Sequence, residues 1–394
     1  MKTNSGMYPN EHVIEIFGEQ VKWPGLGPDG KFTNGSFADS SIKPSFIPAE
    51  TLNLLLDNMQ RVIEAAGLDA NNIEADQLLK ASEALIKSGT VATKPATLVI
   101  GTAASGHTAQ EVDYLCDGTG DQAEINTAIA ALPATGGKVV IREGTYNIAG
   151  RINLNKANTT LEGMGAATIL KRMFDETEDN QGLVHISSPY CTVKSLRING
   201  NKATYANAKN NGIVANAPSG IVTETVCSDS GGNGIYVRGS GCAACKNMCS
   251  GNLLSGICLR GSNCIAIGNI CNNNIHGITV WAGNVCTVNG NTCYANDCGI
   301  KIYGSSINNL ASGNTCKNNE NGIYIEEGIG NAVTGNTSFR GTGVGGDYGS
   351  SQFTILVYGS LSQNNLVSNN IILGKNYVDS SGNATNTFAN NKYN

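Results

Sequence analysis

The stretch Asn233-Gly-Ile-Tyr-Val-Arg-Gly239 recurs as Ser255-Gly-Ile-Cys-Leu-Arg-Gly261, His276-Gly-Ile-Thr-Val-Trp281, Cys298-Gly-Ile-Lys-Ile-Tyr-Gly304 and Asn321-Gly-Ile-Tyr-Ile-Glu326. The glycines of this motif stand at positions 212, 234, 256, 277, 299 and 322, so the steps are 22, 22, 21, 22 and 23 residues. A second motif keeps nearly the same spacing and begins at Asn247, Asn269, Asn291, Asn314 and Asn336. Fixed self-similarity with a period between about 20 and 50 residues indicates a solenoid or a repeat array.

The repeat contains short runs of alternating inward and outward residues, such as Ile300-Lys-Ile-Tyr303, bounded by Gly, Asn and Ser. This alternation is the signature of strands rather than helices. A leucine-rich repeat would need a regular leucine ladder, which the sequence lacks. The pattern therefore predicts an all-β fold, a single-stranded parallel β-helix with 22-residue coils. Like positions would stack at a strand spacing of about 4.8 Å.

Stacking of coils places most of the cysteines in two columns. One contains Cys227, Cys249, Cys271, Cys293 and Cys316, and the other contains Cys242, Cys264 and Cys286 before it continues as Asn309 and Asn331. We interpret both as inward ladders, because a free cysteine packs like a small hydrophobic residue. Disulfides between neighbouring coils remain an alternative, and so does a metal site at Cys242-x-x-Cys245-x-x-x-Cys249. We expect no metal and no cofactor.

The composition narrows the classes of function. Of 394 residues only 14% are charged and 49 are glycine, and the net charge of −5 argues against a nucleic-acid-binding surface. The N-terminus has no apolar signal segment, and no later stretch is apolar over the length needed to span a membrane. Many free cysteines fit assembly in a reducing cytoplasm.

The first part of the chain has a different pattern. Residues 1 to about 47 look irregular, including Trp23 to Gly30, and a helix is predicted from Pro48 to Gly67, followed by a second from Glu74 to Ile86. The apolar face of the first helix would consist of Leu52, Leu55, Leu56, Met59 and Ile63. We expect an attachment or neck region at 1–90, a linker and first strand at 91–115, with 88–96 as connecting chain, and the β-helix at 116–394.

The segment from Cys116-Asp-Gly-Thr-Gly-Asp121 to Gly144-Thr-Tyr146 resembles the opening segment of the pectate-lyase-like, right-handed parallel β-helix superfamily. The resemblance covers roughly residues 97–394, with NosD-like repeats in its later part. It implies a right-handed solenoid whose open end is capped by a helix. Asp121 is expected to N-cap this helix, with Ile125 and Ile129 facing the coil end.

The first 90 residues resemble, more loosely, the N-terminal region of phage and prophage tail-fibre or tailspike proteins, in Phe46-Ile-Pro-Ala-Glu-Thr-Leu-Asn53 and Asp76-Gln-Leu-Leu-Lys80. The two resemblances together imply a virion-borne spike that is made in the bacterial cytoplasm and acts at the host cell surface. Its partners would be a tail or baseplate protein at the N-terminal region and a host surface polysaccharide. Such spikes are usually homotrimers.

Two columns are expected to face outward from the Gly-Ile strands. The first contains Val214, Tyr236, Cys258, Thr279, Lys301, Tyr324 and Leu356, and the second contains Asn216, Arg238, Arg260, Trp281, Tyr303, Glu326 and Tyr358. Aromatic faces beside arginine forks suit an extended acidic oligosaccharide, because rings stack on sugars and guanidinium groups pair with carboxylates. A binding groove, an interface between chains of an oligomer and a plain solvated face all remain open.

Catalytic groups are less clearly marked. Asp297 and Glu320 occupy equivalent positions on successive coils, and Glu326 follows on the last regular coil, so two of them could form an acid and nucleophile pair. Ordinary turn residues are the alternative. Elimination would instead use Lys301 or Tyr303 as base, with Arg238 or Arg260 neutralising a uronate. His276 and Cys298 also stack, without a third orienting group.

The charged insertion Asp175-Glu-Thr-Glu-Asp179 is expected to be an exposed acidic loop, with a wall over a groove or a cation site as alternatives. The signature motifs of polygalacturonases, calcium-dependent pectate lyases and alginate epimerases are absent. The sequence thus favours a tailspike-like protein that binds, and possesses groups that could depolymerise, a surface polysaccharide. The alternative is a non-catalytic structural fibre or adhesin whose β-helix face is an oligomer interface.

Overall fold

The computed structural model describes residues 12–16, 19–23, 49–69, 76–89, 96–375 and 377–393. The chain divides into two compact units, residues 1–93 and 94–394. No described helix combines the length and the apolar character that crossing a bilayer requires.

The first unit contains a hairpin and two helices. Strands β1 (His12–Ile16) and β2 (Glu19–Trp23) pair antiparallel, so the prediction of irregular chain over residues 1–47 is wrong for these ten positions. The predicted helices are present as α1 (Ala49–Ala65) and α2 (Gln77–Gly89). Most of the predicted turn at 23–30 and the connecting chain at 90–95 lie outside the described residues.

The α1 helix ends as predicted, because Gly67 adopts a left-handed conformation with φ of 75°. Its predicted apolar face is only partly buried. Ile63 is buried, but Leu55 is 56% exposed, and the side chains of Leu52 and Leu56 lie outside the described part of the structure.

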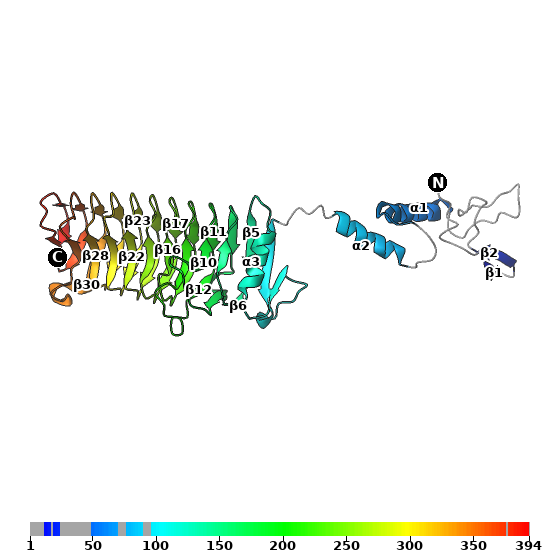
Figure 1. Cartoon of the computed structure of the whole chain (residues 1–394), viewed down its shortest axis with the longest axis horizontal. Coiled ribbons are helices and arrows are strands. Elements are labelled where there is room, and N and C mark those ends of the chain that lie inside the picture. The colour runs from blue at the N-terminus through cyan, green and yellow to red at the C-terminus, as the bar shows by residue number, and fades with distance from the viewer. Residues whose placement is uncertain are drawn as a thin grey trace. The chain divides into compact units, whose positions relative to one another are not determined.

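The second unit is a solenoid of three parallel sheets, and its strands are stacked coil on coil in Figure 1. The predicted fold class, an all-β single-stranded parallel β-helix, is confirmed. The ten-stranded sheet contains β7 (Ile152–Leu154), β10 (Gly182–Ile186), β13 (Asn211–Ala215), β16 (Ile235–Val237), β19 (Ser255–Leu259), β22 (His276–Trp281), β25 (Cys298–Tyr303), β28 (Asn321–Glu326), β31 (Ile355–Tyr358) and β34 (Val378–Ser380).

The thirteen-stranded sheet begins at the N-terminal end of the solenoid. It contains β4 (Tyr114–Cys116), β3 (Thr97–Thr102), β5 (Gly137–Ile141), β8 (Thr159–Glu162), β11 (Thr192–Lys194), β14 (Ile221–Thr223), β17 (Ala243–Cys245), β20 (Ile265–Ile267), β23 (Thr287–Asn289), β26 (Leu310–Ser312), β29 (Ala332–Thr334), β32 (Leu366–Ser368) and β35 (Thr387–Ala389).

The eleven-stranded sheet completes each coil. It contains β6 (Gly144–Ile148), β9 (Thr168–Arg172), β12 (Arg197–Asn199), β15 (Val226–Ser228), β18 (Met248–Ser250), β21 (Ile270–Asn272), β24 (Thr292–Tyr294), β27 (Thr315–Lys317), β30 (Thr337–Val344), β33 (Ile371–Gly374) and β36 (Lys392–Tyr393). Short 3₁₀ helices follow β3 as η2 (Ala103–Ser105), precede β9 as η3 (Gly165–Ala167) and follow β30 as η4 (Gly345–Asp347).

The repeated glycine is explained by close approach between coils. A Cβ atom added to Gly212, Gly234, Gly256, Gly277 or Gly299 would lie between 2.5 and 2.8 Å from the carbonyl oxygen of the glycine on the next coil. Real Cβ atoms do not approach an oxygen so closely, so any other residue would push the coils apart.

The interior contains the predicted cysteine columns. Cys227, Cys249, Cys271, Cys293 and Cys316 pair directly along the eleven-stranded sheet, and all five are buried. All thirteen cysteines are free thiols. Cys245 faces away from the core that holds Cys242 and Cys249, so these three thiols do not converge.

Asparagine ladders run parallel to the cysteine columns at the corners of the coils. One ladder starts at Asn247, whose Oδ1 accepts from the N–H and hydroxyl of Thr225. In each later member, Oδ1 accepts hydrogen bonds from the backbone N–H and the side-chain Nδ2 of the asparagine one coil earlier, for example at 2.8 and 2.9 Å between Asn269 and Asn291. A second buried ladder, which the sequence reading missed, contains Asn252, Asn274, Asn296 and Asn319.

The helix α3 (Gln122–Ala131) lies at the N-terminal end of the solenoid, with Ile125 and Ile129 buried as predicted. Asp121 occupies the predicted N-cap position, but its side chain makes no capping hydrogen bond to the helix N-terminus. Its two oxygens instead accept the backbone N–H groups of Gly118 at 2.8 Å and Asn147 at 2.6 Å. Asp121 thus joins the turn before α3 to strand β6.

Candidate functional site

The predicted outward columns lie on the outer face of the ten-stranded sheet, in the predicted register. Tyr236 pairs with Cys258, which pairs with Thr279, and Lys301 and Tyr324 follow. In the second column Trp281 pairs with Tyr303, and Glu326 and Tyr358 follow. We call the second column, together with Lys301 and Tyr324, the ladder.

The first column faces outward as predicted, but most of its residues are covered by other side chains. Val214, Tyr236, Cys258 and Thr279 are at most 4% exposed. Of these, Val214, Tyr236 and Cys258 form a small apolar layer outside the sheet, and the Trp281 ring packs against it. The buried residues of the first column therefore lie beneath the molecular surface, and longer side chains of the second column pack over them.

The centre of the ladder is a stack of one guanidinium group and two rings. The Trp281 and Tyr303 rings are nearly parallel, 4° apart, with their centroids separated by 5.8 Å. The Arg260 guanidinium lies 4.2 Å from the Trp281 ring centroid, and its Nη1 donates a 3.1 Å hydrogen bond to the Tyr236 hydroxyl. Arg260 is exposed and the two rings are half-buried, so this stack presents a flat, polar-edged platform to solvent.

The C-terminal part of the ladder is organised around Lys301. Its Nζ lies 2.9 Å from a Glu326 carboxylate oxygen, and 4.7 and 5.0 Å from the ring centroids of Tyr303 and Tyr324. The Tyr324 ring meets the Tyr358 ring edge to face, with centroids 6.3 Å apart. Cation and carboxylate are thus held beside the aromatic platform.

Burial controls the protonation of the groups around Lys301. Burial, with smaller contributions from nearby groups, raises the pKa of Tyr303 to about 12. His276 lies beside Cys298 on the neighbouring strand, and burial followed by the Lys301 charge lowers its pKa to about 4. Near neutral pH the Tyr303 hydroxyl is therefore protonated and the His276 imidazole is neutral.

The structure does not bring the three predicted carboxylates together. Asp297 and Glu320 are neighbours on successive coils, both exposed, and burial followed by the Glu320 charge raises the pKa of Asp297. Glu326 lies at the opposite end of the six-residue strand β28, roughly 20 Å from Glu320 at about 3.3 Å per residue. The structure therefore separates an Asp297–Glu320 pair from a Lys301–Glu326 pair.

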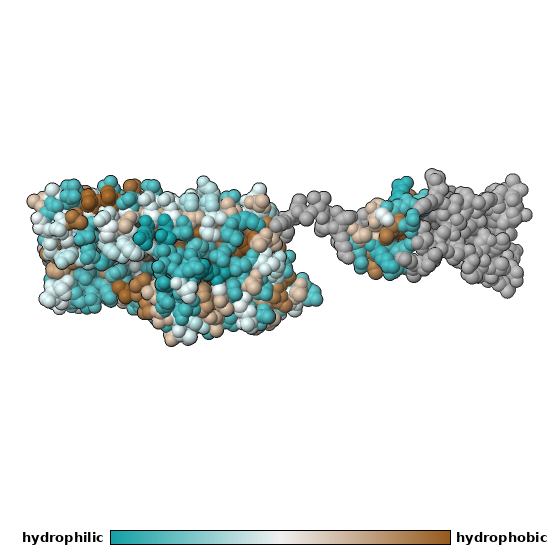
Figure 2. Space-filling view, viewed as in Figure 1, coloured by the Kyte–Doolittle hydropathy of each residue, from teal (hydrophilic) through white to brown (hydrophobic). Residues whose placement is uncertain are grey.

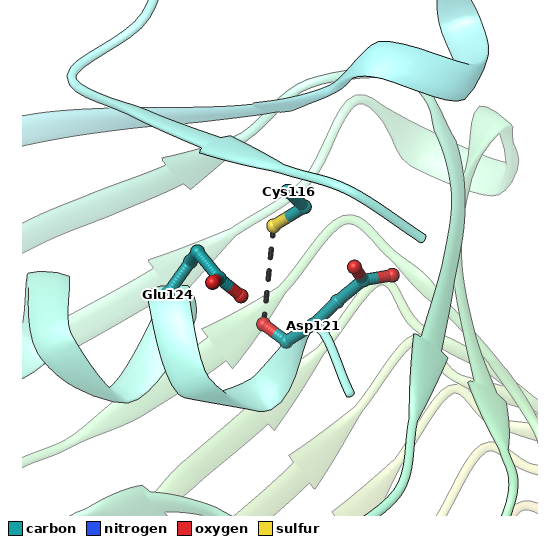
Figure 3. Close-up of side chains that lie close together, drawn as sticks. All are labelled: Cys116, Asp121 and Glu124. Atoms are coloured by element: carbon teal, nitrogen blue, oxygen red, sulfur yellow. Dashed lines mark hydrogen bonds between the residues drawn. The ribbon is translucent and has the colours of Figure 1, made fainter. Parts of the chain in front are cut away.

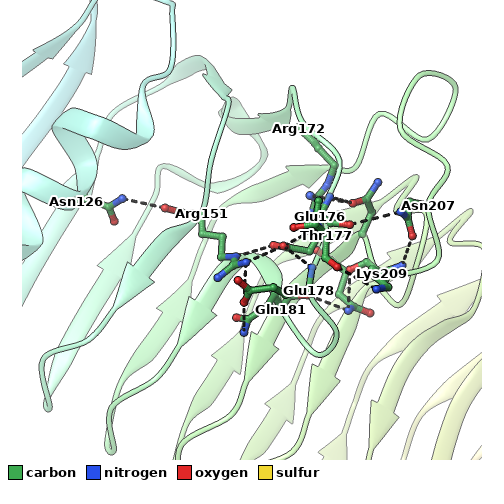
Figure 4. A network of polar contacts seen from close by, with 11 residues as sticks. Asn126, Arg151, Arg172, Glu176, Thr177, Glu178, Gln181, Asn207 and Lys209 are labelled. Carbon is green, nitrogen blue, oxygen red and sulfur yellow. Dashed lines mark hydrogen bonds and ion pairs between the residues drawn. The ribbon is translucent and has the colours of Figure 1, made fainter.

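The charged insertion at 175–179 is exposed as expected at four of its five positions, but Glu176 is buried. Glu176 is 2% exposed, and its carboxylate accepts hydrogen bonds from Arg151 Nε at 2.7 Å and Nη2 at 2.8 Å. Arg151 Nη2 also lies 3.0 Å from Glu178, and Figure 4 shows Arg151 between the two glutamates. The insertion is therefore anchored to the first coils at the edge of the ten-stranded sheet.

A second, buried arginine lies beneath the 175–179 insertion. Arg172 is fully buried, and its Nη2 donates a 2.6 Å hydrogen bond to the Asn211 carbonyl. Asn210 accepts the backbone N–H of Glu176 at 2.7 Å and donates to Asp175, also at 2.7 Å. These contacts could not be predicted from the repeat, because they join two segments that lie outside it.

One group of metal-ligand type occurs among the described residues, at the capped end of the solenoid. Cys116, Asp121 and Glu124 offer ligand atoms within 4.8 Å of one another, as Figure 3 shows. Both Asp121 oxygens already accept backbone N–H groups, and burial raises the pKa of the Cys116 thiol. We interpret the group as part of the cap.

The face that Figure 2 displays is mostly hydrophilic to neutral, with apolar side chains gathered along one edge near the C-terminal coils. Exposed apolar residues of those coils include Leu310, Leu361 and Leu366.

Comparisons with known proteins agree with this architecture. Residues 219–394 match the family model described as periplasmic copper-binding protein (NosD). No curated protein sequence matches the chain.

Among solved structures, the A-module of the Azotobacter vinelandii mannuronan C-5 epimerase AlgE6 is similar, with a TM-score of 0.51, 17% identity and coverage of 70% of this chain and 92% of that one. The Streptococcus pneumoniae surface adhesin PfbA gives a TM-score of 0.51 at 14% identity, covering 70% and 89%. The Dettilon tailspike protein gives 0.50 at 18% identity, covering 70% of this chain and 66% of the tailspike. At such identities these likenesses concern the fold.

The repeat, the three parallel sheets and these comparisons lead to one conclusion: the solenoid of this chain is a pectate-lyase-like, right-handed parallel β-helix with NosD-like repeats.

Proposed function

We propose that the ladder binds an extended polysaccharide on a bacterial cell surface. The observation that carries this proposal is the platform of Arg260, Trp281 and Tyr303. The two rings are parallel, the guanidinium group lies over the Trp281 ring, and all three side chains are at least partly exposed to solvent. Coils repeat about every 4.8 Å along the axis, so a glycan lying along the sheet would meet a new side chain on each coil. Apolar sugar faces would stack on the rings, while the arginines would pair with acidic groups.

The wider role that we propose is that of a phage or prophage tailspike or tail fibre. The fold is shared with the Dettilon tailspike and with an adhesin, and both names fit a protein that works at a cell surface. The N-terminal region would attach to a tail or baseplate protein, the assembled spike would be a homotrimer on the virion, and residues 1–90, 91–115 and 116–394 would be its attachment, connecting and binding parts.

Depolymerisation is the finer proposal, and the geometry offers two sets of groups for it. Hydrolysis would use the neighbouring Asp297 and Glu320. Asp297 would be the acid, because its pKa is raised. Elimination would use Lys301 as base next to the platform, after its ammonium group has passed a proton to Glu326, 2.9 Å away. Tyr303 is the weaker base, because its hydroxyl stays protonated near neutral pH.

Copper binding, which the NosD description names, does not fit the residues of the matched segment. Its columns of thiols are packed in the core at 0–1% exposure. Among the described residues of 219–394, no three His, Cys, Asp or Glu side chains converge as metal ligands, since the one such group lies at Cys116. We therefore derive no role for copper.

The test is binding of the purified chain to capsular and cell-wall polysaccharides from candidate hosts, followed by titration calorimetry on a glycan that binds. Trp281→Ala should weaken affinity by roughly 30-fold, the loss of about 2 kcal/mol expected for a central aromatic contact. Tyr294→Ala is the matched control, since Tyr294 is 38% exposed on the eleven-stranded sheet. Unchanged affinity in Trp281→Ala would refute the proposal.

The same samples distinguish the alternatives. If Trp281→Ala instead dissociates an oligomer in sedimentation, the ladder is an interface between chains, as in a structural fibre. New reducing ends without the ultraviolet absorbance of unsaturated uronates would indicate hydrolysis and lead to Asp297 and Glu320. Both signals together would indicate elimination and lead to Lys301. Binding without either signal would leave an adhesin for the glycans tested.

A further inference from the structure

A buried histidine lies on the same sheet as the ladder, nearer the N-terminal end. His185 is in β10 between Val184 and Ile186, whose side chains belong to the core, so its own side chain is on the outer face. It pairs with Asn153 on one side and with Val214, the first residue of the apolar layer under the ladder, on the other. The outer face is therefore continuous from His185 to Tyr358.

His185 has unused hydrogen-bonding capacity. Its side chain is 6% exposed, and Nδ1 is buried without a partner. Burial lowers the pKa of His185, the Arg151 and Arg238 charges lower it further, and Glu176 and Glu178 oppose this. A buried polar atom without a partner costs about 1–3 kcal/mol, so a bound group that reached it would recover this free energy.

Arg238 follows the strand two coils beyond this histidine, and its guanidinium lies 5.9 Å from the Tyr236 ring centroid. Its Nη1 donates a 3.0 Å hydrogen bond to Asn216, one coil nearer the N-terminus, so the guanidinium points toward the His185 end of the sheet. Its Nε is buried without a partner, and in the described part of the chain no carboxylate lies within ion-pair distance of it. Arg151 differs, because Glu176 and Glu178 already neutralise it.

We propose that Arg238 and His185 form an anion subsite that binds the carboxylate of an acidic sugar and extends the ladder toward the N-terminal coils. Arg238 would donate Nε–H and a free Nη–H to the two carboxylate oxygens, the fork geometry that a guanidinium favours. His185 would donate its ring N–H to the same anion. The insertion anchored by Arg151 and Glu176 would form the wall of the subsite (Figure 4). This inference rests on the proposed function, because it identifies where the glycan-binding face of the protein would hold an acidic sugar.

The experiment uses the full chain labelled with ¹⁵N-histidine and titrated with sodium D-glucuronate, followed by NMR. The chain has four histidines, so the others serve as internal references, and His185→Gln identifies the signal of interest. Glucuronate should shift the His185 ring signals selectively and raise the pKa of His185, since an adjacent carboxylate stabilises the imidazolium. D-glucose should shift neither.

Arg238→Gln should weaken glucuronate binding by roughly tenfold or more, as expected for loss of a charge-assisted pair. Arg197→Gln is the matched control, because Arg197 is also half-buried but belongs to the eleven-stranded sheet. Unmoved His185 signals at saturating glucuronate, or equal affinity in Arg238→Gln and wild type, would overturn the subsite.

The outcome is independent of the ladder test. If Trp281→Ala abolishes polysaccharide binding but glucuronate leaves His185 unaffected, the ladder stands and the subsite falls. If glucuronate binds at His185 but Trp281→Ala binds polysaccharide like wild type, the subsite stands and the proposed ladder falls.

Discussion

Substitution of Asn291 by alanine tests the asparagine ladder as a source of stability. Asn291 is 1% exposed. Its Oδ1 accepts the backbone N–H and the Nδ2 of Asn269 at 2.8 and 2.9 Å, and its Nδ2 donates to the Ala266 carbonyl and to Asn314 Oδ1, both at 2.9 Å. Alanine removes all four bonds and leaves the Asn269 N–H buried without a partner. At about 1 kcal/mol each, the loss should be roughly 4 kcal/mol.

Urea unfolding followed by far-ultraviolet circular dichroism measures this loss as a difference in free energy of unfolding. Asn289→Ala is the control, because Asn289 is half-buried and its Nδ2 reaches only Ser312, at 2.8 and 3.1 Å. We expect at most about 2 kcal/mol for the control, because it loses two hydrogen bonds that water can partly replace at a half-buried position. If Asn291→Ala loses no more stability than the control, the asparagine ladder is not a main contributor to the stability of the coils, and the reasoning is refuted.

Three further predictions concern the packing between coils, the ion pair of Glu176 and the buried thiols. Gly277→Ala should destabilise the chain by about 2–3 kcal/mol, because the new Cβ would lie 2.5 Å from a carbonyl oxygen on the next coil. Gly346→Ala is the control, since its Cβ would enter open space, and equal stability of the two variants would contradict the prediction. Burial opposes ionisation of Glu176, but hydrogen bonds from Arg151 hold its pKa below the ordinary value of 4.5, so its stabilisation is complete near neutral pH and is lost on acidification through the folded-state pKa. Glu176→Gln should therefore lower the melting temperature at neutral pH and flatten its acid dependence, and parallel curves for the two proteins would argue against the ion pair. Of thirteen thiols only Cys245 is not buried, so a thiol reagent should label at most one cysteine in the native chain and thirteen after denaturation, and fast labelling of several native thiols would contradict the packed columns.

The sequence determined the parts of the structure that follow from the repeat. A period of 22 residues places residue i above residue i+22, so the inward cysteine columns, the glycine column and the register of the ladder were all predictable from spacing. Trp281 above Tyr303 is one such neighbour, and its stacking needs only adjacent rungs.

Tertiary structure decided what the period does not encode. Long side chains bend across neighbouring strands, so Arg260 reaches the Tyr236 hydroxyl. Part of the first outward column, including Tyr236, is therefore buried. Position along a strand, rather than sequence proximity, separated Glu326 from Glu320 and joined it to Lys301.

The non-periodic insertions were the least predictable. Glu176 reads in the sequence as one acid among several, and only folding brings Arg151 from the preceding coil to its carboxylate. Asp121 has the type and position of a helix cap, yet two backbone N–H groups from outside the helix compete for its oxygens. The sequence alone therefore determined the solenoid and the order of side chains along its faces. The contacts that bury, pair or free each charge depend on side-chain reach and loop packing, which only the tertiary structure fixes.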